Sequence, residues 1–434
     1  MPRTSQDTSP DSSSALLRKN SRLPKALAAL SHRGFPLLLA GQAAALLGTW
    51  VQGTAQRWLI LELTNSPLAV GLLGAVAGLP ILLFAFMGGW LADRLPRISF
   101  LRGIHTIVLV QSVIFGLLVQ SGLINVYEIL ALAFMLGVGM AFEVPARQSL
   151  LYDLVGRNDI TNALALHSTT FNLARFTGPA ISGLLMGAGL LYACFYIKAL
   201  SCIIVILMLT AVARTLPGMN TPPPTNRERK GFLNSLKEVL GFAHSHRIVG
   251  PLLLIVVLFS ILLLPYSILL PSLGRDILGL GAKEYGFLCA ANGLGALLSA
   301  MFVATFGHRG SRERWWWTGA VLFPVSLVFT GMAATYWQAM TLLFISGFVM
   351  VITTTSAISL LQLNAPDHLR GQLMGIFTTS FMGLFPVGSL LQGSLAQYVG
   401  IRFTMTGTAC VAFAVVAVIM FKSIKGIAYS KAGH

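Results

Sequence analysis

Charged and polar side chains embedded in long apolar segments are the residues of this sequence best suited to bind a small molecule. In one segment Asn172, Arg175 and Ser182 follow Ser168 at offsets of 4, 7 and 14 residues. This spacing places all four on one face of a helix. A charge in the middle of a membrane-spanning helix costs about 2.5 to 3.5 kcal/mol and must find water or a partner. Asn172 and Arg175 are therefore candidates for substrate contact, the alternative being a structural bond from Arg175 to another helix.

A second polar face lies on the first apolar segment. Gln52 and Gln56 belong to this face, and Arg57 is beside it. Arg57 and Lys198 both fall toward the outer ends of their segments, where a long side chain either extends to the membrane surface or contacts a substrate. We include all four residues in a predicted substrate cavity.

The second half of the sequence differs from the first in the charge of its apolar segments. Its apolar segments hold no interior charge, so recognition there would use polar and apolar contacts only. The polar side chains that complete the predicted cavity are Asn292, Thr355 and Gln362.

A membrane enzyme would need a nucleophile with a base, or clustered metal ligands, at membrane depth. We find no such constellation. The cysteines lie inside apolar segments at spacings that suit neither a disulfide framework nor a metal site, and we interpret them as packing residues: Cys194, Cys202, Cys289 and Cys410. We expect no enzyme activity, no cofactor and no bound metal. A sensor without net transport is disfavoured because the sequence offers no sizeable cytoplasmic signalling domain.

The elements that must position these residues are membrane-spanning helices. The 434 residues are 55% hydrophobic and only 10% charged, whereas soluble domains have about 25% charged residues. Apolar runs of about 20 residues, long enough to cross about 30 Å of hydrocarbon, recur along the chain. Barrel strands would be short and alternating, so a barrel is excluded. We predict twelve spans, near residues 35–61, 68–92, 103–122, 126–142, 162–187, 190–213, 248–272, 284–306, 315–334, 338–363, 372–396 and 403–421.

The basic residues sort to one side of these spans. With the N terminus in the cytoplasm, most of the 30 lysines and arginines fall in cytoplasmic tails and loops, the positive-inside pattern. Both termini are then cytoplasmic, in an inner-membrane protein. The formal charge of +16 indicates this topology and contact with anionic lipids, and not nucleic-acid binding.

A proline-rich and basic segment divides the spans into two sets of six. Internal repetition supports the division, because GWLADRLPR after the second span has a degenerate counterpart, ATFGHRGSR, after the eighth. The predicted organisation is a cytoplasmic tail at 1–34, a six-helix bundle at 35–213, a linker with an amphipathic surface helix at 214–247, a second bundle at 248–422 and a tail at 423–434.

Four stretches together resemble a known transporter family. They are GTWVQGTAQRWLILELTNSPLAVG at 48–71, GGWLADRLPR at 88–97, AFEVPARQSLLYDLVGRNDITNALALHSTTFNLARFTGPAISGLL at 141–185 and APDHLRGQLMGIF at 365–377. The chain resembles the major facilitator superfamily over its whole length, and within it the branch of macrolide, other drug and siderophore exporters. The resemblance implies an all-α membrane protein of twelve helices in two pseudo-symmetric bundles, with a cavity between them that opens to each side alternately. It also implies a monomer.

Two motifs of the family are matched. Its loop motif after the second span, where charges can lock the cytoplasmic face, corresponds to Gly89, Asp93, Arg94 and Arg97. Glu143 and Asp153 are candidate partners of Arg94 or Arg97, and loss of Asp93 or Arg94 should cripple transport. The antiporter motif, in which a Gly-Pro step and small residues allow a kink and close helix approach, corresponds to Gly178, Pro179 and Gly183. This motif favours export.

Proton antiport is also implied by the resemblance. No Asp or Glu lies in the middle of a predicted span, so the group that carries the proton would be Glu143, His167 or Glu62, with Glu143 first. The imidazole of His167 has an unperturbed pKa of about 6.5, although it could equally be a hydrogen-bonded helix residue. We predict an exporter of amphipathic or anionic small molecules, siderophores or drug-like compounds, with protons and lipids as its other partners. The rival hypotheses are an importer or a lipid flippase on the same fold.

Overall fold

The computed structural model describes residues 25–216, 241–243, 245–307, 311–366 and 369–432. The linker at 214–247, with its predicted surface helix, falls mostly outside these residues, as do His308 and Arg309 of the repeated motif. Residues Lys25–Ser31 of the predicted N-terminal tail form a short 3-10 helix, η1, that packs against α5.

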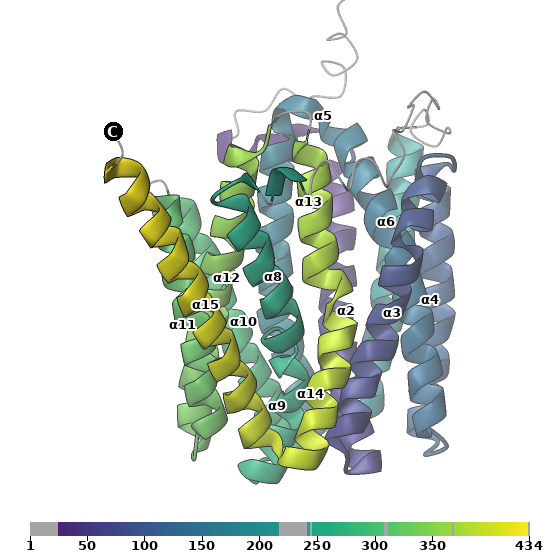
Figure 1. Cartoon of the computed structure of the whole chain (residues 1–434). Helices are drawn as coiled ribbons and strands as arrows, with labels where there is room; N and C mark the ends of the chain where they lie inside the picture. The colour runs from purple at the N-terminus through teal and green to yellow at the C-terminus, as the bar shows by residue number, and fades with distance from the viewer. Residues whose placement is uncertain (1–24, 217–240, 244, 308–310, 367–368, 433–434) are drawn as a thin grey trace, which may run out of the picture.

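All regular structure in the described part of the chain is helical (Figure 1). The first group of helices consists of α2 (Phe35–Thr64), α3 (Pro67–Ala92), α4 (Arg97–Gln120), α5 (Val126–Gly187) and α6 (Leu191–Thr215). The second group consists of α8 (Val249–Leu262), α9 (Tyr266–Ser272) with η3 (Leu273–Ile277), α10 (Ala282–Phe306), α11 (Arg312–Met332), α12 (Tyr336–Asn364), α13 (Arg370–Thr378) with η4 (Thr379–Gly383), α14 (Phe385–Val399) and α15 (Ile401–Ala432).

Local sequence sets the ends of these helices. The Asn125 side chain accepts a hydrogen bond from the Glu128 backbone N–H, and the Glu128 carboxylate accepts one from the Asn125 N–H, so α5 begins on a reciprocal cap. Ser66 caps α3 in the same position, directly before Pro67. Short, capped turns of this kind join helices that run in opposite directions.

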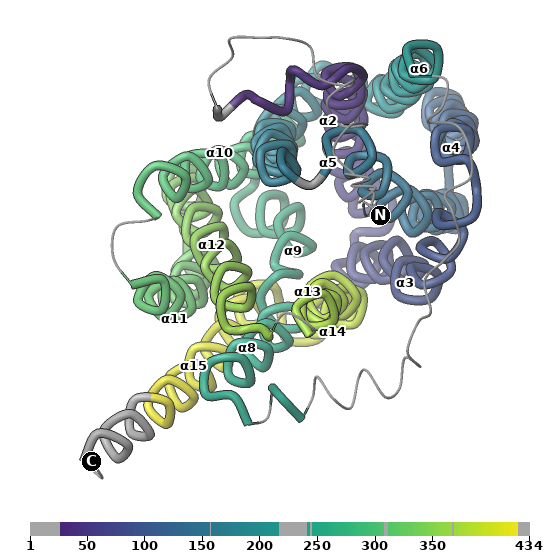
Figure 2. Tube along the Cα trace, turned by 90° about the horizontal axis from the view of Figure 1, so that it is seen from above, coloured from purple at the N-terminus to yellow at the C-terminus, as the bar shows by residue number. Residues whose placement is uncertain are grey.

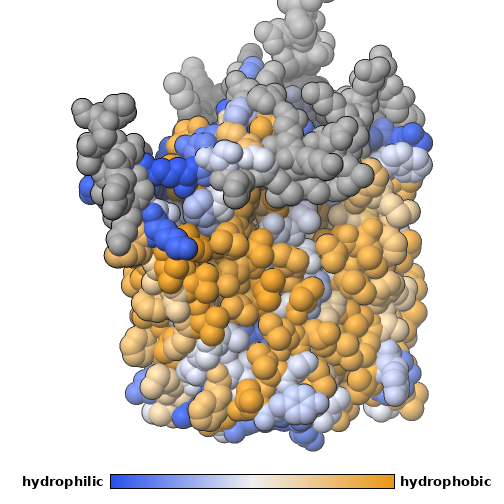
Figure 3. All heavy atoms as spheres, in the orientation of Figure 1, coloured by the Kyte–Doolittle hydropathy of each residue, from blue (hydrophilic) through white to orange (hydrophobic). Residues whose placement is uncertain are grey.

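The outside of the molecule is apolar over most of its height. Figure 3 shows this apolar zone, with hydrophilic residues gathered at the upper and lower ends. Eleven helices in the described part are long and apolar enough to cross a membrane. Large side chains such as Phe329, Phe403 and Phe421 are more than half exposed on them, as expected where the solvent is lipid. The chain is a multi-pass membrane protein.

The predicted end of the fourth span was wrong. The helix does not stop near residue 142 but continues to Gly156, where φ is +68° and the chain turns back within α5. Polar residues from Glu143 onward interrupt the hydropathy, yet they are paired inside the protein and leave the helix intact. The following segment, to Gly187, contains the predicted fifth span and is not among the eleven apolar candidates.

The two groups of helices meet along two lines, α3 against α14 and α5 against α10. Seen from above in Figure 2, α2 to α6 lie on one side and α8 to α15 on the other, with α9 between them. Two close contacts lie toward the lower end: a Cβ on Gly71 would lie 2.7 Å from Gly393 Cα, and one on Gly286 would lie 2.3 Å from Gly183 Cα. We call these contacts the lower closure.

Two hydrogen bonds between the groups lie at the same lower end. The Arg275 guanidinium donates to the carbonyl of Leu61 at 3.0 Å, and the Ser66 hydroxyl donates to Gln397 at 2.8 Å. Toward the upper end the close glycine contact of α3 is with its own group. A Cβ on Gly88 would lie 2.2 Å from the Ala141 carbonyl oxygen of α5. A Cβ added to Gly371 or Gly375 of α13 would meet no atom of the described residues within 4 Å.

Candidate functional site

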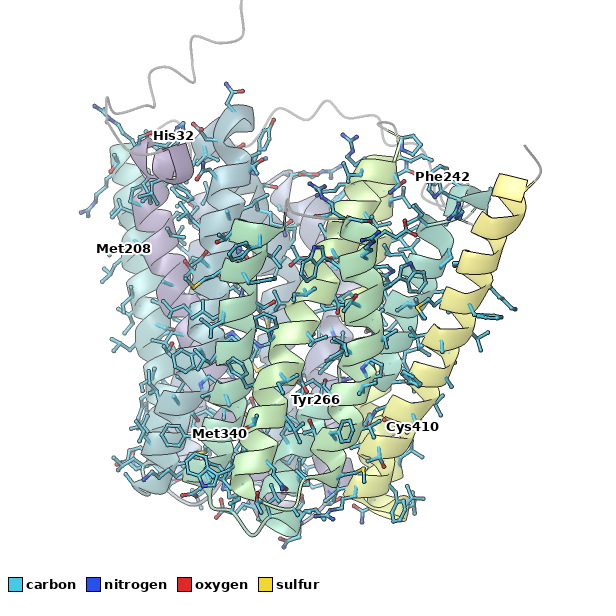
Figure 4. All side chains as sticks on the ribbon, turned by 90° about the vertical axis from the view of Figure 1, so that its left-hand side faces the viewer. His32, Met208, Phe242, Tyr266, Met340 and Cys410 are labelled. Carbon is cyan, nitrogen blue, oxygen red and sulfur yellow. The ribbon has the colours of Figure 1, made fainter. Side chains whose placement is uncertain are left out.

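Arg175 lies where the two groups of helices meet. Its guanidinium donates a 2.7 Å hydrogen bond to the side-chain oxygen of Asn292, 117 residues away on α10. The Tyr266 side chain, from α9, lies beside the same pair, and the guanidinium stands 5.8 Å from the Trp50 ring centroid on α2. Figure 4 places Tyr266 in the interior, below the middle of the molecule. The structure thus brings two predicted cavity residues, Arg175 and Asn292, into direct contact.

Arg57 approaches the same place from α2. Its guanidinium lies beside the Tyr285 hydroxyl and Cys289, both on α10. Tyr285 is fully buried and stacks on Trp58 with ring centroids 5.4 Å apart. Cys289 is close to Arg57 and Arg175 alike. Arg57 therefore points inward between the helix groups and does not extend to the membrane surface.

A second polar cluster lies within the first group of helices, nearer the upper end. Arg147 forms an ion pair with Glu143 one turn earlier, at 3.5 Å, and donates to His167 Nε2 at 2.8 Å. His105 Nε2, on α4, is 4.0 Å from the same Glu143 oxygen. Two of the proposed proton carriers, Glu143 and His167, are thereby joined through one arginine. We call these four residues the Glu143 cluster.

Lys198 belongs to the interior of the first group. It is 3% exposed and donates a 3.0 Å hydrogen bond to Thr49. Its ammonium adds positive charge near Glu143. In this conformation it is enclosed between α2 and α6 and separated from solvent.

The other residues predicted for the cavity, and Glu62, are distributed over several parts of the molecule. Gln52 is fully buried, and neither amide atom has a hydrogen-bond partner among the described residues. Gln56 and Asn172 bond to the backbone carbonyls of Ile129 and Ser168. Thr355 lines a cavity of about 210 Å³ between α10, α11 and α12. The exposed residues are Gln362 and Glu62, at the upper end of α12 and the lower end of α2.

The loop motif is organised by an ion pair within the first group. Arg97 at the start of α4 pairs with Asp153 near the upper end of the first part of α5, which confirms one of the pairings expected from the sequence. Arg94 instead stacks over the Trp90 ring at 4.0 Å. Asp93 ends α3, its N–H bonding to the Gly89 carbonyl at 3.1 Å. Glu143, the other expected partner, is engaged by Arg147.

We expect the Arg97–Asp153 pair to behave as a unit. Arg97→Ala and Asp153→Asn should each slow transport and lower the melting temperature, and the double variant should be little worse than either one. A partly exposed pair of this kind is worth about 0.5 to 1 kcal/mol of coupling. Melting curves of the four proteins measure it. Fully additive losses would mean that the two residues act separately.

The Gly-Pro motif serves close packing. A Cβ on Gly178 would lie 2.5 Å from Trp50 Cβ, and one on Gly183 would lie 2.8 Å from the Lys283 carbonyl oxygen. Gly178 therefore packs α5 onto α2, whereas Gly183 packs it onto α10 across the lower closure. Small residues at these positions allow backbones to approach closely in the membrane.

Sequence reasoning missed several partners. The sequence did not pair His105 or Arg147 with Glu143, although Arg147 follows Glu143 by four residues, a helical ion-pair spacing. Tyr285 and Cys289 beside Arg57 could not be found from the sequence, because neither carries a charge and both belong to the other helix group.

A bundle of membrane-spanning helices, with charged side chains enclosed where two groups meet, defines a membrane transporter. The family described as transmembrane secretion effector matches residues 24–430. The chain belongs to this family of the major facilitator superfamily, as its sequence motifs indicated. Its relatives are transporters, so the expectation of a transporter in place of an enzyme is confirmed.

Three relatives illustrate the family. The chain is 23% identical to the staphyloferrin A transporter of Staphylococcus aureus, over 87% of this chain and 94% of that protein. It is 26% identical to the multidrug efflux pump Tap of Mycolicibacterium fortuitum, over 85% and 91%. It is 25% identical to the enterobactin exporter EntS of Shigella boydii, over 84% and 86%.

Solved structures share the fold at lower identity. A POT family transporter in complex with a thioalcohol-conjugated peptide superposes with a TM-score of 0.75 at 13% identity, covering 93% of this chain and 98% of that one. A bacterial homologue of the human lysosomal transporter Spinster gives a TM-score of 0.64 at 15% identity, covering 93% and 98%.

Proposed function

We propose that this protein exports small amphipathic molecules, siderophores or drug-like compounds, by alternating access. The observation that carries the proposal is the one-sided contact between the helix groups. Close backbone contacts and hydrogen bonds join them at the lower end, while Gly88 nearer the upper end packs within its own group and Gly371 and Gly375 meet no described atom within 4 Å. Rocking about the central contacts would break the lower closure and bring the upper parts together.

The upper end is then the cytoplasmic side. The basic residues of the sequence concentrate in the segments that join helices there, as the positive-inside pattern requires. In this topology α5 supplies two crossings, one on each side of Gly156, so that twelve helices form two bundles of six, at 35–213 and 248–422. Both termini are cytoplasmic, and the chain acts as a monomer in the inner membrane.

The relatives support export as the direction of transport. Two of the three are named as an efflux pump or an exporter, and the Gly178 and Gly183 contacts fit a motif of exporting antiporters. The cytoplasm-open conformation is the one that loads an export substrate.

Proton exchange would use the Glu143 cluster. Glu143 is enclosed within the first helix group, with a side chain 17% exposed. It faces His105 and is held by Arg147, which also contacts His167. A proton arriving on Glu143 would free Arg147, and that release can be transmitted along both parts of α5.

Comparison of a deletion strain with its parent tests export. The parent culture medium should contain at least one small molecule that the deletion strain retains in its cells, and restoring the gene should return it to the medium. Mass spectrometry of medium and cell extracts measures both pools. A compound that is present in the parent cells but missing from the cells of the deletion strain would instead indicate import.

A further inference from the structure

We propose that Arg57 and Arg175 together bind two anionic oxygen groups of one substrate, so that the preferred cargo is an amphipathic dianion. The inference rests on the proposed function, because it assigns a substrate class to the same central site. It goes further in naming two residues that would set specificity by charge.

The two arginines come from different helices but reach one place. Arg57 is on α2 and Arg175 on α5, and each lies close to Cys289 and Tyr266 of the opposite group. Both side chains are only partly buried. The Gly183–Gly286 contact of the lower closure lies two turns from Arg175 toward the outside and is next to Tyr285, which Arg57 approaches.

Neither guanidinium has an anionic partner in the described part of the chain. Among the described residues no carboxylate forms an ion pair with Arg57 or Arg175, and the groups against them are neutral: Tyr266, Tyr285, Cys289 and Asn292. Arg57 Nε is buried without any hydrogen-bond partner in this part of the chain. Two like charges held together in a poorly solvated site are unfavourable unless a ligand neutralises them.

Arginines elsewhere in the membrane region behave differently. Arg97 and Arg147 pair with Asp153 and Glu143, and Arg275 pairs with Asp276. Among the described residues, Arg57 and Arg175 instead face neutral groups at the place where the helix groups meet. A carboxylate or phenolate oxygen of a ligand would supply the negative charge that these guanidinium groups lack. A planar guanidinium can bind a carboxylate through two parallel hydrogen bonds.

Aromatic side chains beside the arginines suit an apolar body on the same ligand. Trp50 lies beneath Arg175 and packs edge-on against Phe171, with ring centroids 5.8 Å apart. Phe171 is one turn from Arg175 on the cytoplasmic side and is 37% exposed. An entering molecule would thus meet an aromatic wall first and the two charges at its end.

Binding of phthalate to the purified, detergent-solubilised full-length protein tests the proposal. Phthalate, benzoate and dimethyl phthalate share one aromatic body and carry two, one and no anionic groups. Thermal unfolding over a concentration series gives the apparent affinity for each. We expect phthalate to bind at least about 10-fold more tightly than benzoate and dimethyl phthalate to give no shift, since each charged contact is worth about 10- to 100-fold.

Arg57→Gln and Arg175→Gln should each weaken phthalate binding by about 10- to 100-fold and remove its advantage over benzoate. Arg402→Gln is the matched control, because Arg402 bonds to the Ala333 carbonyl at the lower end, away from the site. Without ligand, the two site variants should melt at or above the wild-type temperature, whereas a structural role predicts a lower one. Equal binding of the three probes, or an unchanged preference in both variants, would overturn the proposal. Because no gradient is needed, this outcome is separate from a failure of export.

Discussion

Replacing Glu143 with Gln should abolish proton-driven transport, by about 100-fold or more, while leaving the protein folded. Glutamine keeps the size and the hydrogen-bonding capacity of the side chain but cannot exchange a proton, so Arg147 would never be released and recaptured. The ion pair of Glu143 with Arg147 and its approach to His105 make this carboxylate the centre of the cluster. Proteoliposomes with an imposed pH gradient measure accumulation directly.

The matched control is Glu62→Gln. Glu62 is the other carboxylate that the sequence offered, but it is exposed at the lower end of α2, and its loss should leave transport unchanged. Exchange of substrate across the membrane without a gradient should survive in Glu143→Gln, because it needs no proton. Gradient-driven accumulation by Glu143→Gln at the wild-type rate would remove Glu143 from the coupling mechanism.

Substituting Gly286 with Val should prevent the lower closure from forming. A Cβ at this position would lie 2.3 Å from Gly183 Cα and 2.7 Å from the Pro179 carbonyl oxygen, and neither backbone can yield without separating α5 from α10. The cytoplasm-open state should therefore lose population, and transport should fall by about 100-fold, since a few kcal/mol suffices to shift such an equilibrium.

Cys289, one turn from Gly286, reports on this change. The experiment uses a protein whose other three cysteines are replaced by Ala. A membrane-impermeant thiol reagent added outside should label Cys289 much faster in the Gly286→Val variant than in the protein that keeps Gly286. Gly103→Val is the control, because a Cβ on Gly103 would meet no described atom within 4 Å. Unchanged labelling with normal transport would show that the α5–α10 contact does not close the outer side.

Hydropathy predicted the helices well where lipid surrounds them and less well where side chains are paired inside. The helices from α8 to α15 lie close to their predicted ranges because apolar residues cover them almost throughout. The fourth span was predicted too short because charged residues from Glu143 onward end the apolar run. Glu143 pairs with Arg147, and Asp153 pairs with Arg97, so the helix continues past them to Gly156.

The candidate site was predictable one helix at a time. A charge in an apolar segment identified Arg57, Arg175 and Lys198, but their different fates depend on packing between helices. Lys198 turns toward Thr49 within its own group, whereas Arg175 meets Asn292 across the interface. Ser182, on the same predicted face as Arg175, is fully buried and contacts Cys194 at 3.6 Å. The periodicity of a sequence predicts which residues share one face of a helix. The residues that this face contacts on other helices are known only from the assembled fold.

Transport by inside-out membrane vesicles tests the central claim most directly. Vesicles from cells that produce the wild-type protein, and others with Glu143→Gln, are supplied with a cell metabolite extract and energised to make their interior acidic. We predict that the wild-type vesicles accumulate at least one amphipathic acid, that Glu143→Gln vesicles do not, and that collapsing the pH gradient releases it. Gradient-dependent uptake of that compound by right-side-out vesicles alone would contradict the account, because the protein would then be an importer.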